Sequence, residues 1–242
     1  MKVFGLIGYP LEHSFSASYF AGKFSAEGIR AEYRNFPLQD ISGFEELIRN
    51  EPELIGLNVT VPFKEKVIPY LDSLGATANA IRAVNTVCIF RGHGRMKLIG
   101  HNTDVAGFRR SLEEHLGIKH DAALVLGSGG SSKAVRHVLK NLGIPFRVVS
   151  RSGGGGKISY GELDEQTVKE HRLIVNTTPL GMHPDLETYP AIPYGGVTPG
   201  HLLFDLVYNP ARTRFLTRGE EQGATVVNGY DMLVYLSLIH IS

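Results

Sequence analysis

Residues 122–130, Ala-Ala-Leu-Val-Leu-Gly-Ser-Gly-Gly, place a short apolar run directly before a glycine-rich turn. The apolar run is typical of a buried strand, and residues 131–142, followed by Gly143 and Pro145, have the pattern of a helix with its stop signals. Glycines between a strand and a helix allow a tight turn, and the amide groups of the helix N-terminus then favour a phosphate. The stretch predicts a dinucleotide-binding turn, with an ordinary glycine-rich turn as the alternative.

On both sides of this turn the sequence alternates short apolar strands with helices. Strands are predicted at residues 2–7, 31–36, 54–61, 83–90, 96–101, 122–126, 146–149, 173–175 and 202–205, and helices at 16–27, 41–50, 103–116 and 131–142. Such alternation predicts a mostly parallel sheet covered by helices, and from residue 103 onward the pattern is doubly wound and Rossmann-like. The predicted fold is therefore α/β with two domains: residues 1–102 with the tail 229–242 for a substrate, and residues 103–228 for a dinucleotide.

The composition is that of a soluble globular protein: of 242 residues, 43% are hydrophobic and 20% are charged. The net charge of +1 gives no long-range attraction to nucleic acid or to an anionic membrane. No apolar run approaches the roughly 18 residues of a membrane span, and residues 1–7 are too short for a signal peptide. The lone Cys88 fits a reducing compartment. We expect a cytoplasmic monomer or homodimer that binds neither nucleic acid nor membrane.

Residues 58–64, Asn-Val-Thr-Val-Pro-Phe-Lys, carry the strongest chemical signal. Alternate residues of a strand face the same way, so the side chains of Asn58 and Thr60 are expected to point into one space. Pro62 stops the strand, and Lys64 is expected at the start of the next helix. A lysine beside neutral hydrogen-bonding groups is a candidate proton donor. A lysine after a strand is otherwise a solvated residue at a helix start.

Residues 58–64 and six further motifs resemble, in the same order, those of the shikimate dehydrogenase family. The six are Ser14-Phe-Ser16, Ala83-Val-Asn-Thr86, Gly100-His-Asn-Thr-Asp104, Gly127-Ser-Gly-Gly-Ser-Ser-Lys-Ala134, Asn176-Thr-Thr-Pro-Leu-Gly-Met182 and Asn228-Gly-Tyr-Asp-Met-Leu-Val234. One such motif is weak evidence, but seven in order, from Gly8 to about Tyr235, are specific. The resemblance implies an enzyme that reduces 3-dehydroshikimate to shikimate with NADPH, on the route to chorismate and the aromatic amino acids.

The resemblance also assigns the substrate side of the site. It implies that Lys64 is the catalytic acid/base and that Asp104 is its partner. The substrate residues it implies are Ser14, Ser16 and Tyr208 for the carboxylate, with Thr60 nearby, and Asn58, Asn85 and Asp104 for the hydroxyl groups. From the residues alone, the two serines would serve equally well as helix caps, and residues 208–210 as a turn.

The cofactor implied by the resemblance is NADP. The cofactor residues are Gly127, Ser128, Gly129, Gly130, Ser131, Ser150, Arg151, Ser152, Leu206 and Gly229. An NAD site calls for an acidic residue about 20 residues beyond the glycines, and Arg151 stands there instead, with a side chain suited to a 2′-phosphate. A surface arginine is the alternative. The rival function is a quinate/shikimate dehydrogenase that uses NAD, and its family members often have Thr at the position of Ser16 and Asp near Arg151.

No metal site is predicted, because the histidines show no HExxH spacing and one cysteine cannot form a cluster. Cys88 lies in an apolar stretch, and we expect a buried strand residue rather than a nucleophile. The four glycines at residues 153–156 indicate a flexible loop rather than a specific phosphate clasp.

The carboxyl end departs from the family pattern. Leu236 stands where the family usually has a glutamine that contacts substrate. The apolar residues 236–242 do not continue a helical stripe and resemble translated sequencing-adapter sequence, so we expect a foreign tail, with a genuine divergent terminus as the alternative. A truncated, catalytically impaired or ligand-sensing paralogue is therefore a second alternative function, against which the presence of both Lys64 and Asp104 argues.

Overall fold

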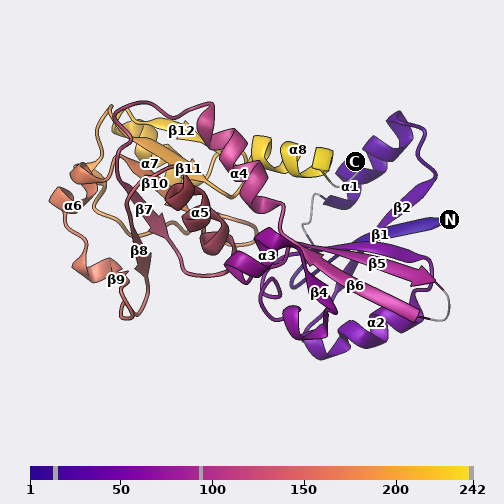
Figure 1. Cartoon of the computed structure of the whole chain (residues 1–242). Coiled ribbons are helices and arrows are strands. Elements are labelled where there is room, and N and C mark those ends of the chain that lie inside the picture. The colour runs from indigo at the N-terminus through magenta and orange to yellow at the C-terminus, as the bar shows by residue number, and fades with distance from the viewer. Residues whose placement is uncertain (13–15, 93–94, 240–242) are drawn as a thin grey trace. The chain divides into compact units, whose positions relative to one another are not determined.

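The computed structural model describes residues 1–12, 16–92 and 95–239, and the chain divides into two compact units, Met1–Thr103 and Asp104–Ser242 (Figure 1). The first boundary therefore lies one residue beyond the predicted one. Within the described ranges, every helix is too short or too polar to span a lipid bilayer.

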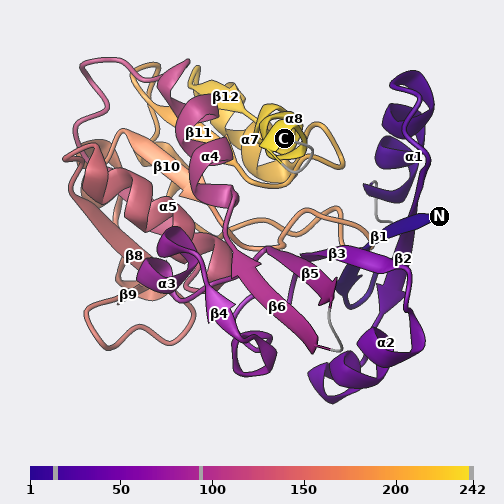
Figure 2. The ribbon, with the colours of Figure 1, turned by 45° about the vertical axis from the view of Figure 1, so that its right-hand side comes forward.

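The described part of the first unit contains a mixed sheet of six strands in the order β2-β1-β3-β5-β6-β4. Its strands are β1 (Lys2–Gly8), β2 (Ala31–Pro37), β3 (Leu54–Val59), β4 (Ser73–Leu74), β5 (Thr86–Gly92) and β6 (Arg95–His101), and its helices are α1 (Ser16–Ala26), α2 (Phe44–Asn50) and α3 (Ala76–Ile81). Strands β2, β1 and β3 are parallel, whereas β5 is antiparallel to both β3 and β6. The strands predicted at residues 83–90 and 96–101 correspond to the antiparallel β5–β6 pair, which Figure 2 shows as neighbouring arrows.

The two long helices of this unit cover opposite faces of the sheet, because successive side chains of β1 point in opposite directions. Ile7 packs in one apolar cluster with Phe44 of α2. Leu6 packs in another with Phe20 of α1. Burial on both faces explains why β1 is apolar along most of its length.

The described part of the second unit contains six parallel strands in the order β12-β11-β10-β7-β8-β9. Its strands are β7 (Ala123–Leu126), β8 (Phe146–Ser150), β9 (Ile158–Ser159), β10 (Leu173–Asn176), β11 (Leu202–Asp205) and β12 (Thr225–Val227), and its helices are α4 (Asp104–Glu113), α5 (Gly130–Asn141), α6 (Glu165–Glu170), α7 (Arg214–Glu221) and α8 (Tyr230–Ile239). Strand β7 lies between β8 and β10, so the chain continues outward from β7 in both directions. This is the doubly wound order that the sequence predicted.

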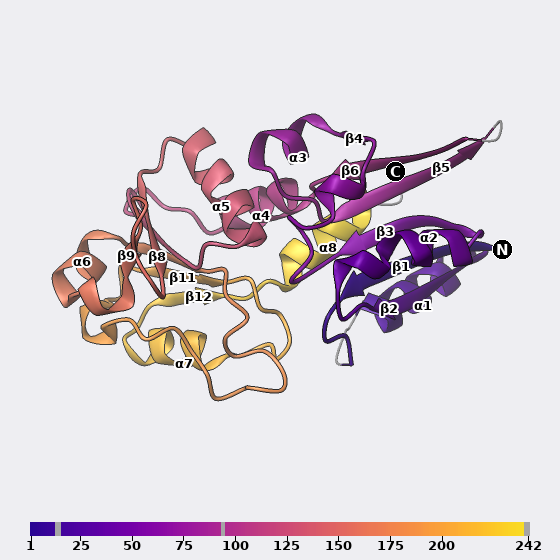
Figure 3. The same ribbon diagram turned by 90° about the horizontal axis from the view of Figure 1, so that it is seen from below.

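Helices cover both faces of the second sheet (Figure 3). Val125 of β7 packs with Phe108 of α4 and Val138 of α5. Its neighbour Leu124 points to the other face and packs with Phe215 of α7. The carboxyl ends of β7, β10 and β11 are therefore held at one edge of a rigid, covered sheet, where ligands bind in open α/β folds.

Three local predictions differ from the structure. Four short 3-10 helices occur among the described residues, at Ile41–Gly43, Ile68–Tyr70, Tyr160–Glu162 and Tyr194–Gly196. The first of them replaces the start of the helix expected at residues 41–50, because Asp40 caps residue Ser42 and a new helix begins at Phe44. Strand β3 ends at Val59, two residues earlier than expected. No α-helix begins at Lys64, which lies in a turn that leads to the second 3-10 helix.

The carboxyl-terminal segment is helical as far as Ile239, whereas the sequence did not favour a helix beyond residue 235. Helix α8 packs against α4 of the second unit, and the guanidinium carbon of Arg110 lies 4.1 Å from the centre of the Tyr235 ring. The sequence had instead assigned residues 229–242 to the first domain. The side chains from residue 236 onward lie outside the described part of the structure, so the expected foreign tail stays a prediction.

Candidate active site

The ends of β3 and β5 bring the polar motifs of the first unit together. Asn58 is the register partner of Thr86 in the antiparallel β3–β5 pair. The N–H of Val59 donates to the carbonyl of Asn85 at 2.8 Å, and the N–H of Val84 donates to the carbonyl of Lys64 at 2.7 Å. These backbone bonds hold the segments that carry Asn58, Lys64 and Asn85 side by side.

Asn85 is buried and tied to the residue that precedes Asp104. Its Nδ2 donates to Thr103 Oγ1 at 2.9 Å, and its Oδ1 accepts from the Thr103 N–H at 2.9 Å. Thr86 Oγ1 also donates to Asn85 Oδ1, at 3.1 Å. Thr103 is the last residue before α4. Its hydroxyl joins the Asn85 network, donating to Asn85 Oδ1 at 3.2 Å, and the helix starts at the buried Asp104.

Tyr33 orients Asn58, a contact that the sequence did not suggest. The hydroxyl of Tyr33, a residue of β2, donates to Asn58 Oδ1 at 2.8 Å. In the sheet, β1 lies between β2 and β3. Because an amide oxygen held in this way fixes the rotation of the amide, the direction of the Asn58 NH₂ group is fixed too. The sequence offers no signal for this contact, because the two residues lie on different strands and are 25 positions apart in the chain.

The remaining substrate-side residues occupy defined places, each within its own unit. Lys64 and Thr60 are half-buried, and the Thr60 N–H donates to the carbonyl of Ile7 at 2.9 Å. Ser16 is the first residue of α1. Ser14 lies outside the described residues. Tyr208 is half-buried and follows β11 in the second unit.

The predicted dinucleotide turn has the geometry that close approach to a phosphate requires. Gly127 has φ of +108°, and a Cβ built on it would lie 2.6 Å from Thr177 Oγ1. Gly129 is the N-cap of α5 and provides no side-chain cap, and no acidic residue lies in the first turn. The N-terminus of α5 therefore carries neither a capping side chain at Gly129 nor a carboxylate in its first turn, and the dipole of this 12-residue helix favours an anion there.

Leu206 and Gly229, predicted together as cofactor residues, lie against each other. A Cβ on Gly229 would come within 2.3 Å of the Leu206 carbonyl oxygen, so only glycine fits there. The N–H of Gly229 also donates to the carbonyl of Val207 at 3.2 Å. This contact joins the end of β11 to the start of α8, on the same edge of the sheet as the glycine turn.

The end of β8 offers polar groups suited to a phosphorylated ribose. Ser150 is buried, and its Oγ has no hydrogen-bond partner within the described part of the chain. Arg151 and Ser152 are exposed. Burial raises the pKa of Tyr160, and the charge of Arg151 partly offsets the rise, which places the guanidinium in the neighbourhood of this hydroxyl.

The next carboxylate along the chain, Glu162, is already engaged. Its Oε2 accepts from the Ser159 N–H at 2.6 Å and closes a capping box. The glycines at 153–156 form the predicted loop, and all four have positive φ. Together with the uncapped α5 and the unpartnered Ser150 hydroxyl, this arrangement fits a dinucleotide that carries a 2′-phosphate.

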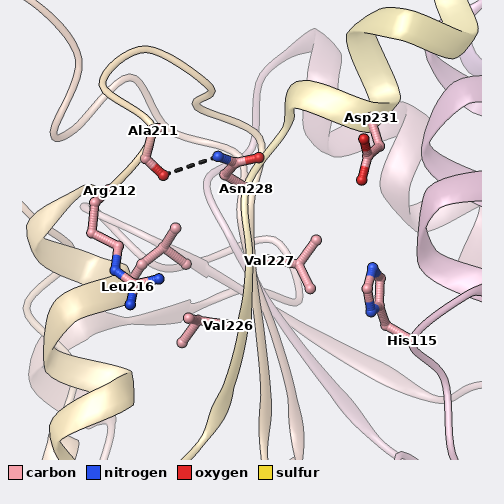
Figure 4. A pocket seen from close by; sticks show the side chains of 8 residues that line it. All are labelled: His115, Ala211, Arg212, Leu216, Val226, Val227, Asn228 and Asp231. Carbon is pink, nitrogen blue, oxygen red and sulfur yellow. Dashed lines mark hydrogen bonds between the residues drawn. The ribbon is translucent and has the colours of Figure 1, made fainter.

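One group of potential metal ligands lies away from these motifs. Glu114, His115 and Asp231 have donor atoms within 4.8 Å of one another, and Tyr235 donates to Glu114 Oε1 at 2.6 Å. Figure 4 shows the carboxylate of Asp231 and the ring of His115 turned towards each other beside β12. They line part of a cavity of about 250 Å³ that contains none of the predicted site residues. Exposed acidic groups often gather in this way without a metal, so we assign no ion to them.

Cys88 lies in β5 as predicted, but it is half-buried rather than fully buried. Burial raises the pKa of its thiol. A raised pKa keeps the sulfur protonated near neutral pH, which argues against a nucleophile.

Comparison with known proteins identifies the family. A model of the shikimate dehydrogenase substrate binding domain matches residues 6–87. A shikimate dehydrogenase (NADP(+)) of Carboxydothermus hydrogenoformans is 36% identical over 262 residues, which cover 98% of this chain and 89% of the relative. The chain belongs to the shikimate dehydrogenase family. The resemblance seen in the seven sequence motifs is thereby confirmed.

Solved structures of this family share the α/β fold. The structure of shikimate 5-dehydrogenase from Thermus thermophilus in complex with NADP(H) and shikimate matches with a TM-score of 0.84 at 29% identity, covering 100% of this chain and 92% of that one. Shikimate 5-dehydrogenase from Listeria monocytogenes, in complex with shikimate and NAD, matches with a TM-score of 0.77 at 26% identity, covering 98% and 89%. The α/β prediction with a Rossmann-like unit is confirmed.

Proposed function

We propose that this chain catalyses the reduction of 3-dehydroshikimate to shikimate with NADPH, a step towards chorismate and the aromatic amino acids. The observation that carries the proposal is the hydrogen-bonded arrangement at the ends of β3 and β5. The backbone of Lys64 is bonded to Val84, and the adjacent Asn85 is bonded to Thr103, the residue before Asp104. These bonds hold the backbone of Lys64 and the residue that precedes Asp104 beside the β3–β5 pair within the first unit.

The reaction needs a hydride at the carbonyl carbon and a proton at the carbonyl oxygen. Bound NADPH supplies the hydride. The ammonium of Lys64 donates the proton to the developing alkoxide and recovers it in the reverse direction. Asp104 is assigned as its acid–base partner, because a carboxylate stabilises the charged form of lysine.

The neutral polar residues orient the substrate. Asn58, its amide fixed by Tyr33, and Asn85 are assigned to the ring hydroxyl groups. Ser14, Ser16 and Tyr208 are assigned to the carboxylate, with Thr60 nearby. Neutral donors are suitable for this carboxylate because Lys64 already supplies a positive charge to the site.

The cofactor is assigned to the edge of the second sheet. The residues that would hold it are Gly127, Ser128, Gly129, Gly130, Ser131, Ser150, Arg151, Ser152, Leu206 and Gly229. Arg151 would bind the 2′-phosphate and thereby favour NADP over NAD. The domain roles follow the sequence prediction, with residues 1–102 for substrate and 103–228 for NADP, except that helix α8 of the predicted tail 229–242 packs in the second unit. A cytoplasmic monomer or homodimer is part of the proposal.

The test is a spectrophotometric assay that pairs shikimate or quinate with NADP or NAD. We expect the highest kcat/KM for shikimate with NADP. A preference for quinate with NAD would support the rival dehydrogenase. Binding of shikimate without turnover in any pairing would support an impaired or ligand-sensing protein.

A further inference from the structure

Asp205, at the end of β11, is a buried carboxylate that receives hydrogen bonds from three separate segments. Its Oδ1 accepts from Asn176 Nδ2 at 2.9 Å and from the Val207 N–H at 3.0 Å. Its Oδ2 accepts from Thr213 Oγ1 at 2.6 Å. The residue has no exposed surface, and none of the described lysines or arginines forms an ion pair with it.

The bond to Asn176 continues towards the glycine turn. Asn176 Oδ1 accepts from the N–H of Thr178 at 3.0 Å and from its hydroxyl at 2.7 Å. Thr177 Oγ1 donates to the carbonyl of Leu126, the residue before Gly127, at 2.7 Å. A Cβ on Gly127 would contact both threonines, at 2.6 Å and 3.0 Å. The segment after β10 is therefore packed directly against the turn assigned to the cofactor.

The two carboxylate oxygens serve different parts of the unit. Oδ1 reaches Asn176 and so the edge of the sheet at which the glycine turn lies. Oδ2 reaches Thr213, the N-cap of α7, whose side chain also accepts from the Leu216 N–H at 3.4 Å. A role in stability alone would involve both oxygens equally, whereas a role in positioning the turn would depend on Oδ1.

We propose that Asp205 is a positioning residue for the cofactor, which acts through Asn176 to hold residues 177 and 178 against the glycine turn. The inference rests on the proposed function, because it assumes that the turn binds a dinucleotide. Asp205 itself is not assigned a contact with the cofactor. Its carboxyl group is suited to the task because both of its oxygens accept hydrogen bonds here, so the Asn176 NH₂ group faces Oδ1 and the Asn176 oxygen faces Thr178.

The experiment compares Asn176→Ala with Thr213→Val, each of which removes one bond to Asp205. Dissociation constants for NADP are measured by calorimetric titration, and the melting temperature is measured without cofactor. We expect Asn176→Ala to raise the dissociation constant by about tenfold. We expect Thr213→Val to lower the melting temperature but to leave the dissociation constant within about twofold of wild type. Asp164→Ala, which removes the unrelated N-cap of α6, is the matched control for a general loss of stability.

Substitution of Asp205 itself provides a second line of evidence. Asp205→Asn keeps an acceptor for Asn176 and Val207, so cofactor affinity should stay within about threefold of wild type, whereas Asp205→Ala should lose about tenfold or more. If Asp205→Ala does not fold, the dissociation constant of Asn176→Ala for NADP still tests the proposal. Equal cofactor affinity in Asn176→Ala and wild type would overturn the proposal. Failure of wild type itself to bind NADP would instead overturn the proposed function.

Discussion

In the unit Met1–Thr103, side-chain hydrogen bonds orient the candidate amides, whereas in Asp104–Ser242 the candidate glycines also depend on the close approach of their own backbone to neighbouring segments. Asn58 depends on Tyr33, and Asn85 depends on Thr103. Gly127 and Gly229 instead depend on contacts that a Cβ atom would prevent. A substrate with several hydroxyl groups calls for oriented amides, and a pyrophosphate calls for exposed N–H groups. Substitutions of Asn58, Lys64 and Asn85 should therefore alter chemistry and substrate binding, and those in the glycine turn should alter cofactor binding.

The largest expected effect tests the chemical half of this comparison. Lys64→Ala should lower kcat by roughly 10²- to 10⁴-fold, because general acid–base groups typically contribute that much. The dissociation constant for NADP should not change. Turnover and calorimetric titration measure the two quantities. Near-normal turnover would remove Lys64 from the mechanism, and a parallel loss of NADP binding would break the separation between the units.

Gly127→Ala tests whether the glycine turn depends on close approach of its backbone. The left-handed backbone costs an alanine about 1–2 kcal/mol, and the contact with Thr177 adds about 1–3 kcal/mol. We expect a loss of stability of roughly 2–5 kcal/mol together with weaker NADP binding. Chemical denaturation and calorimetric titration measure the two effects.

The matched control is Gly143→Ala. This glycine has φ of +70° but no neighbour within 4 Å of a built Cβ. Chemical denaturation should give only the backbone cost of about 1–2 kcal/mol, with unchanged NADP affinity. Equal results for the two variants would show that the packing at Gly127 does not matter.

Asp205 should make the stability of the second unit depend on pH. Burial raises the pKa of this carboxyl to about 7, although its three hydrogen bonds lower it. Tyr194 is the titratable group that interacts electrostatically with Asp205, and burial raises the pKa of the Tyr194 hydroxyl. The Arg218 guanidinium lies 5.5 Å from the centre of the Tyr194 ring. An aspartate with a raised folded pKa binds protons more strongly in the folded state. Its contribution to stability is therefore complete below about pH 4 and is lost as the pH rises through about 7.

The measurement is urea denaturation of wild type and Asp205→Asn at pH 5 and pH 8. The unfolding free energy of wild type should fall by roughly 2–4 kcal/mol more than that of the variant between the two pH values. Identical pH dependence would mean that Asp205 is ionised throughout this range.

The smallest expected effect concerns the choice of cofactor. Arg151→Ala removes a charged hydrogen-bond donor worth about 1.5–3 kcal/mol, so the dissociation constant for NADP should rise by roughly 10- to 150-fold. The dissociation constant for NAD should change little, because NAD lacks the 2′-phosphate. If the affinities for both cofactors fall equally, Arg151 has a packing role.

The difference between the units also explains what the sequence could predict. The strand, the glycine turn and the helix at residues 123–141 follow from local propensity and apolar pattern, and their predicted bounds were correct to within one residue. Lys64 was expected at the start of a helix after Pro62, yet the backbone turns there instead. The partners of Asn58, Asn85 and Asp205 could not be predicted. Tyr33, Thr103 and Asn176 come from distant segments, and hydrogen bonds between side chains leave no periodic pattern in the sequence.

The ends of the two sheets bear on how the protein behaves at high concentration. Of the four sheet edges in the described ranges, three are formed by β4, β9 and β12, which are only two or three residues long. The fourth, β2, is seven residues long, but Arg34 on it is bonded to Glu32 and Glu51, and Pro37 ends it. Short or charged edges resist pairing with strands of other molecules. Among these four edges, β2 alone is long enough to accept an added strand, and its charged pair opposes this. Replacing Glu32 and Arg34 with valine would create an uncharged, aggregation-prone edge.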